Sequence, residues 1–178
     1  MRIRLIIVIA LFCGAVLLYF IASKKDASKE GDMRLTSTAF QEGEKIPSQY
    51  TCDGDDVNPP LHISETPDGT VSFALVMDDP DAPGSTWDHW IVWDISPDTN
   101  EIVENSVPPN ARQGTNDFQR LQWGGPCPPN GTHRYIFTLY ALDTFLDLEE
   151  GATKDDLEQV MQGHILAQAQ LLGYYQRP

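Results

Sequence analysis

The chain has 178 residues, 41% hydrophobic and 21% charged, which allows one domain with a substantial core and a short appendage. Its formal net charge is −14. Because residues 1–25 hold four basic residues and no acid, the remainder carries 8 basic and 26 acidic residues, a net charge of −18. That surface excludes nucleic acid as a partner, and any anion site within it has to be a short-range pocket of hydrogen-bond donors.

Residues 1–22 have the pattern of a membrane-directed segment. "MRIR" precedes eighteen uncharged residues, "LIIVIALFCGAVLLYFIA" (5–22). That run has the length of a membrane span, about 17–25 residues, and exceeds the core of a secretory signal, about 7–15 residues. We expect a transmembrane anchor with the domain exported to the periplasmic or extracellular side; the alternative is a cleaved signal and a secreted domain. The polar residues 23–33 are expected to tether a domain of residues 34–178.

Three segments are predicted to be long β-strands: 70–79, 87–95 and 133–142. All three are rich in aromatic and β-branched residues. Both alternating sets of 70–79 are largely apolar, which is typical of an interior strand. In 87–95, alternation would place Trp87, His89, Ile91 and Trp93 on one face. Residues 34–40 and 59–64 are predicted to form shorter strands.

One helix is predicted near the C-terminus. Thr153 has the character of an N-cap, with Asp156 three residues on, and apolar residues recur at helical spacing from Leu157 to Leu171. Strands followed by a helix predict a mainly β sandwich with a C-terminal helix. Residues 96–132 lack periodicity, and unstructured loops beyond about 12–15 residues are uncommon unless they are functional or disordered.

Two histidines stand at similar places in the predicted strands. His89 and His133 each share a face with an aromatic residue, Trp87 or Tyr135, and each follows a proline-rich turn, "DDPDAPGST" (78–86) or "GGPCPPNGT" (124–132). The repeated arrangement suggests two loop-to-strand junctions facing one pocket. Imidazoles, a tyrosine hydroxyl and backbone N–H groups could bind a phosphate-like anion there, with Asp79 orienting an imidazole. From spacing alone, two satisfied core histidines are the better interpretation.

Other chemistries have weaker support in the sequence. HxxxH, HExxH and CxxC spacings are absent, so no metal site is predicted, and Ser85 lacks the GxSxG context of a nucleophile. A hydrolase with His89 as base and Asp79 as its orienting residue is a third hypothesis. Cys52 and Cys127 could form a disulfide in an oxidising compartment, but their spacing leaves bridged and free states open.

The order of these motifs resembles the phosphatidylethanolamine-binding protein family. The resemblance rests on "DPDAP" (79–83), "HW" (89–90), "GGPCPP" (124–129) and "HRYIFTLYAL" (133–142). "YTCDG" with "NPPL" (50–61) and "RQGTNDF" (112–118) resemble its bacterial Raf-kinase-inhibitor-like branch. It covers about residues 34–175, essentially the whole predicted domain.

The resemblance implies two antiparallel sheets in a Greek-key sandwich with a C-terminal helical element. It implies a non-catalytic protein without a cofactor, whose small pocket binds phosphate or a phosphorylethanolamine-type lipid head group. Carried over to this chain, the pocket would comprise Asp79, Asp81, Pro83, His89, Gly125, Pro126, His133 and Tyr135. Some family members inhibit kinases or proteases, so the alternative is an inhibitor acting through residues 96–132 and the pocket rim. The "GPCPPNGTHRY" loop differs in length from that of eukaryotic kinase-inhibiting members, so partner identity is not carried over.

Overall fold

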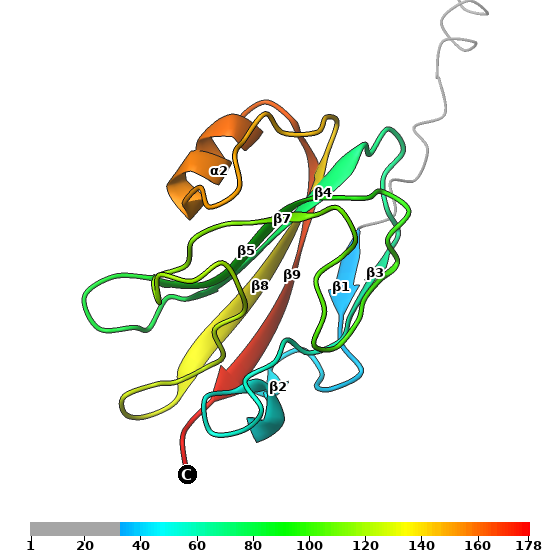
Figure 1. The fold of residues 1–178 in the computed structure, drawn as a ribbon. Coiled ribbons are helices and arrows are strands. Elements are labelled where there is room, and N and C mark those ends of the chain that lie inside the picture. Colours follow the sequence, from blue (N-terminus) through cyan, green and yellow to red (C-terminus); the bar gives the residue numbers. More distant parts are fainter. Residues whose placement is uncertain (1–32) are drawn as a thin grey trace, which may run out of the picture. The chain divides into compact units, whose positions relative to one another are not determined.

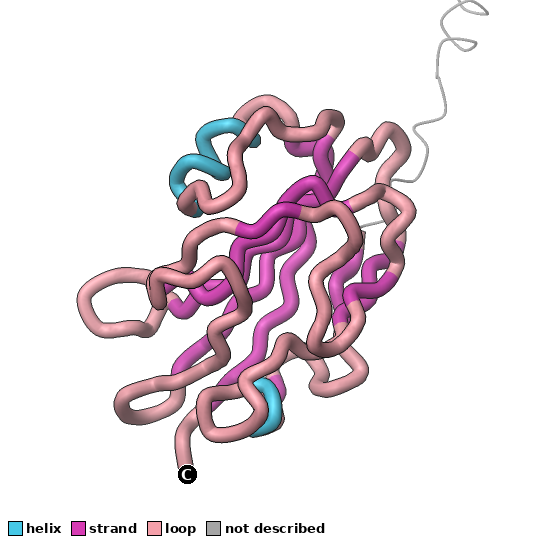
Figure 2. The backbone as a smooth tube through the Cα atoms, in the orientation of Figure 1, coloured by secondary structure: helices cyan, strands magenta, loops and turns pink. Residues whose placement is uncertain are grey.

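The computed structural model describes residues 33–178, so the predicted anchor and almost all of the predicted tether lie outside the described residues. Two β-sheets, one α-helix and a short 3-10 helix, η1 (Ser48–Tyr50), make up the described part (Figures 1 and 2). Within residues 33–178, no helix combines the length and the apolar character that crossing a membrane requires.

The smaller sheet has three antiparallel strands in the order β1-β3-β6. Their bounds are β1 (Arg34–Thr36), β3 (Leu61–Ser64) and β6 (Glu101–Ile102). The larger sheet has the order β2-β9-β8-β4-β5-β7. Its strands are β2 (Glu44–Lys45), β4 (Ser72–Asp79), β5 (Trp87–Ile95), β7 (Arg112–Gln113), β8 (His133–Leu142) and β9 (Ile165–Tyr175). The three long strands predicted from alternation are therefore confirmed as β4, β5 and β8.

The larger sheet contains the predicted Greek-key order but is not purely antiparallel. β4, β5 and β7 pair in succession, and β8 returns to lie antiparallel beside β4, which gives the spatial order β8-β4-β5-β7. β2 pairs with β9 in the parallel direction. The 96–132 segment, predicted without regular structure, contributes β6 and β7 to the edges of the two sheets.

The predicted helix is confirmed, but it is shorter than expected. α2 spans Lys154–Met161, and Thr153 and Asp156 form the expected capping box. The predicted extension to Leu171 is wrong, because Gly163 adopts a left-handed conformation, φ 85°, and residues 165–175 form β9. The apolar residues of this stretch are compatible with a helix or a strand, and the ten pairings with β8 make it a strand.

Both faces of the larger sheet are buried, because each is covered by a different layer. One face packs against the smaller sheet through side chains such as Leu35, Leu61 and Phe137. On the opposite face, Leu157 and Met161 of α2 pack on the long strands. Figure 1 shows α2 and the β1–β3 pair on opposite sides of these strands. The cavity described below lies where β4 ends and β5 and β8 begin.

Candidate functional site

A β-bulge in β5 determines where His89 points. Met77 pairs with Trp90, and the next residue of β4, Asp78, pairs with Asp88, so one step along β4 spans two along β5 and His89 is the extra residue. The predicted common face of Trp87, His89, Ile91 and Trp93 is therefore wrong. Ile91 and Trp93 pack beneath α2, whereas Trp87 and His89 line a cavity on the other side. Strict alternation cannot anticipate an inserted residue.

The cavity has a volume of about 320 Å³ and lies between the β4–β5 turn and the 118–129 segment. Its lining residues are Asp79, Ala82, Pro83, Trp87, His89, Phe118, Cys127 and Pro129. Asp79, Pro83 and His89 of the predicted set thus line it directly. Phe118 was not among the predicted site residues, and its ring packs edge-on against both Trp87 and His89.

His89 is held in one orientation by a backbone contact. Its Nδ1 lies 2.6 Å from the carbonyl oxygen of Gly124, and its ring packs edge-on against Tyr135. Because a carbonyl oxygen only accepts hydrogen bonds, Nδ1 carries the hydrogen and Nε2 is the nitrogen that titrates. Burial lowers the pKa of His89, although the hydrogen bond to Gly124 and the charge of Asp79 oppose that shift. The free protein therefore holds His89 mainly neutral at pH 7.

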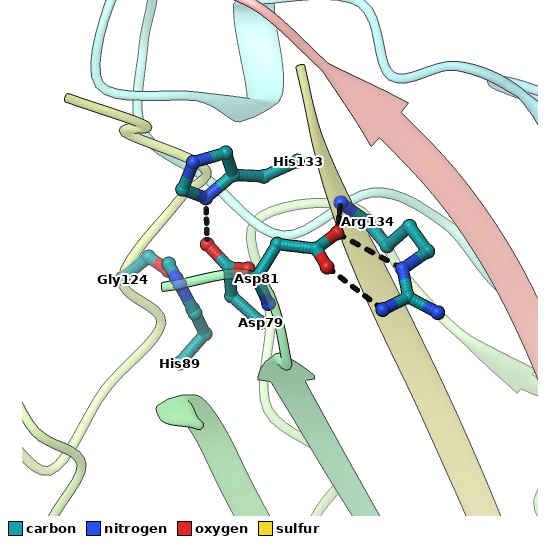
Figure 3. A network of polar contacts seen from close by, with 6 residues as sticks. All are labelled: Asp79, Asp81, His89, Gly124, His133 and Arg134. Carbon is teal, nitrogen blue, oxygen red and sulfur yellow. Dashed lines mark hydrogen bonds and ion pairs between the residues drawn. The ribbon is translucent and has the colours of Figure 1, made fainter. Parts of the chain in front are cut away.

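Asp79 pairs with His133 and not with His89 (Figure 3). His133 Nδ1 lies 2.7 Å from Asp79 Oδ2, and both side chains are buried. The other carboxylate oxygen, Oδ1, accepts the backbone N–H of Asp81 at 2.8 Å. Asp79 is therefore the partner of His133, and the structure does not supply the His89–Asp79 pair that the hydrolase hypothesis required.

Asp81 does not line the cavity, but it links two elements beside it. Its carboxylate accepts two hydrogen bonds from the Arg134 guanidinium, at 2.9 and 2.7 Å, and a third from the Arg134 backbone N–H (Figure 3). These bonds lower the pKa of Asp81 to about 2. The contact ties the β4–β5 turn to the start of β8. Arg134 was missed, and its only signal in the sequence was its place next to His133.

The remaining predicted residues lie outside the cavity lining: Tyr135, Gly125, Pro126 and, bonded to Asp79, His133. Tyr135 is fully buried, and its hydroxyl has no hydrogen-bond partner among residues 33–178. Burial, followed by the negative charge of Asp79, raises the pKa of Tyr135, so the hydroxyl keeps its proton. The Gly125 N–H donates to Asp56 Oδ1 at 2.7 Å, and the Pro126 carbonyl accepts the N–H of Cys52 at 3.2 Å. These contacts fix the loop that carries Gly124.

A disulfide joins Cys52 to Cys127, the two cysteines whose state the sequence left open. Cys127 lines the cavity, so the bridge ties the cavity wall to the turn after η1. Within the described part of the chain, no cluster of three or more histidine, cysteine or acidic side chains could hold a metal ion.

A β-sandwich with a small cavity beside two buried histidines has the architecture of a ligand-binding domain. Residues 36–176 match the family model described as phosphatidylethanolamine-binding protein. The chain belongs to this family.

Relatives and solved structures agree with this membership. A UPF0098 protein of Methanothermobacter thermautotrophicus is 48% identical over 150 residues, which cover 82% of this chain and 99% of that protein. The crystal structure of a phosphatidylethanolamine-binding protein homologue from Chlamydia trachomatis has a TM-score of 0.80 and 41% identity, covering 83% of this chain and 99% of its own. Escherichia coli YbcL, described as a member of the mammalian family, has a TM-score of 0.78 and 30% identity, covering 83% and 100%.

Proposed function

We propose that the cavity binds a small phosphate-type anion, either phosphate itself or a phosphorylethanolamine-type head group, without catalysing a reaction. One observation carries the proposal: both histidines have Nδ1 held by fixed acceptors, the Gly124 carbonyl and the Asp79 carboxylate. Nε2 is then the one ring nitrogen of each histidine that remains to contact a ligand. Membership in the phosphatidylethanolamine-binding protein family supports the same ligand class.

The charges around the cavity set conditions on the ligand. The Asp79 carboxylate faces the His133 imidazole, with Oδ2 2.7 Å from Nδ1, so that oxygen is already engaged by a hydrogen-bond donor. His89 is mainly neutral at pH 7 and takes up a proton when an anion binds next to it. The net charge of −14 opposes anion approach at long range, so recognition depends on contacts inside the cavity.

A binding role has more support than hydrolysis. The carboxylate of Asp79 is engaged by His133, and the cavity cysteine, Cys127, is held in a disulfide. Among residues 33–178, His89 therefore has neither the paired carboxylate of the hydrolase hypothesis nor a free cysteine thiol in the cavity beside it.

Inhibition of a protease or kinase through residues 96–132 has less support. Val103, Val107 and Leu121 are exposed in that segment, but exposed apolar residues are ordinary on folded proteins. The N-terminal anchor remains a prediction; it would keep the cavity close to phospholipid head groups.

Isothermal titration calorimetry tests the proposal. The full chain is titrated with phosphorylethanolamine and with sulfate, an anion that does not titrate, at about pH 6 and about pH 8. Binding is expected to be tighter at the lower pH and to fall about tenfold or more in His89→Ala and His133→Ala. His164→Ala is the matched control, because His164 is an exposed histidine that also pairs through Nδ1 with an aspartate, Asp143. Absence of binding to the wild type, or equal binding by His89→Ala, would refute the proposal.

A further inference from the structure

Lys154 contacts the site from the face of the sheet opposite the cavity. Its Nζ lies 3.0 Å from Asp78 Oδ2 and 2.9 Å from Asp88 Oδ1, and all three side chains are largely buried. We propose that Lys154 is a positioning residue of the ligand cavity, which clamps Asp78 to Asp88 and thereby holds the β-bulge that turns His89 toward the cavity. The consequence for ligand binding rests on the proposed function; the positioning of His89 does not.

The clamp acts at the two chain positions next to the cavity residues. Asp78 directly precedes Asp79, and Asp88 directly precedes His89. Asp78 and Asp88 are also the paired residues next to the bulge. Two carboxylates opposite each other on neighbouring strands repel, and a single ammonium group between them converts that repulsion into a link between β4 and β5.

The fold delivers Lys154 to this place through several fixed contacts. Lys154 is the first residue of α2, directly after the capping-box residue Thr153. Leu157, one turn further on, is fully buried against the sheet. The Ala152 carbonyl accepts the Thr115 N–H at 3.0 Å, which ties the start of the helix to the loop after β7. The position of the Lys154 side chain is therefore fixed by the fold, unlike that of a freely moving surface lysine.

The loop of residues 116–124 contacts the bulge from the side opposite α2. The N–H of Asp88 donates to Asp117 Oδ2 at 2.7 Å, and Asn116 Nδ2 donates to the His89 carbonyl at 2.8 Å. The Gly124 N–H donates to the same carbonyl at 3.2 Å. The bulge is thus fixed between this loop and α2, and Lys154 supplies the contacts from α2 that involve charge.

The buried charges explain why the clamp is needed. Burial raises the pKa of Asp88, and its hydrogen bond to Lys154 counteracts that shift. Without the ammonium group, two buried carboxylates would face each other with Asp117 nearby, and relief requires a proton or movement of the bulge. Movement would displace His89 and lengthen its hydrogen bond to Gly124.

Two variants of the full chain test this inference, with Lys45→Met as the control. Lys154→Met removes the ammonium group, and the triple variant Lys154→Met/Asp78→Asn/Asp88→Asn removes the clamp without leaving buried charge, so it reports even if the single variant fails to fold. Lys45 lies on β2 and contacts the Tyr175 ring, so the control removes the same charge at another place in the fold.

Two readouts separate positioning from binding. In the ligand-free protein, NMR follows the Nδ1 proton of His89, whose signal reports the bond to Gly124; in the same samples, calorimetry measures sulfate affinity. We expect the His89 signal to shift or to exchange faster in both Lys154 variants, and sulfate affinity to fall about threefold to tenfold. A wild-type His89 signal in either folded variant would overturn the inference. A shifted signal in a protein whose wild type does not bind sulfate or phosphorylethanolamine would uphold the positioning role and reject the proposed function.

Discussion

The disulfide gives the largest predicted effect on stability. Replacing both partners, Cys52→Ser/Cys127→Ser, frees the unfolded chain from a loop closed over a sequence separation of 75. The chain-entropy relation assigns about 4.5 kcal/mol at 25 °C to a loop of that length. Cys52 is exposed and Cys127 half-buried, so the exchange of sulfur for oxygen adds little cavity cost. We therefore expect the free energy of unfolding to fall by roughly 3–5 kcal/mol.

Urea unfolding, followed by tryptophan fluorescence, measures this loss. The variant should unfold at a lower urea concentration and with a somewhat steeper dependence on urea, because its unfolded state is more expanded. Wild-type protein with a reductant serves as the second arm, and it should unfold close to the variant. A loss below about 1 kcal/mol in both arms would refute the reasoning, since the cross-link would then not constrain the unfolded chain.

Three smaller predictions concern the surroundings of the cavity. Asp81→Ala should cost less than about 1 kcal/mol by urea unfolding, because the ion pair with Arg134 is partly exposed. The pKa of Asp81 is lowered from 3.8 to about 2. Its contribution to the free energy of unfolding is therefore present above about pH 4 and is lost as pH falls through about 2. An acid titration that shows no difference in stability between wild type and variant in that window would contradict this. Gly125→Ala should lower the thermal unfolding temperature more than Gly131→Ala does. A Cβ at Gly125 would lie 2.6 Å from a backbone oxygen, whereas at Gly131 the surrounding space is open and only the φ of 68° disfavours alanine. Equal losses of stability would contradict a fixed loop at Gly125. Burial lowers the pKa of His89 in the free protein, and a bound anion would raise it. Sulfate affinity should therefore be highest below the pKa of the free protein, fall by at most about tenfold per pH unit as pH rises from there to the higher pKa of the complex, and level off above it. A flat pH profile would rule out proton uptake at His89.

The long strands could be predicted because their local pattern and their final environment agree. β4 is buried on both faces, as its doubly apolar alternation indicated. The last segment shows the opposite case. Residues 165–171 carry an apolar pattern compatible with helix or strand, and long-range pairing with β8 decides between them.

Only part of the site could be predicted from the sequence, for the same physical reason. His89 and His133 could be found because their local contexts repeat, but the bulge that redirects His89 is a property of the β4–β5 pairing. Arg134 and Lys154 were missed, because single basic residues carry no spacing signal until the fold places them beside carboxylates. Local motifs therefore identified Asp79, Pro83 and His89 of the cavity wall, whereas Phe118 and the residues that hold the wall became visible only through tertiary contacts.

A crystal structure of the protein grown with phosphorylethanolamine at about pH 6 tests the central claim most directly. Anion binding in the 320 Å³ cavity predicts phosphate density within hydrogen-bonding distance of His89 Nε2, with His89 Nδ1 still bonded to Gly124. An empty cavity at a ligand concentration that saturates binding in solution, or density elsewhere on the protein, would contradict it.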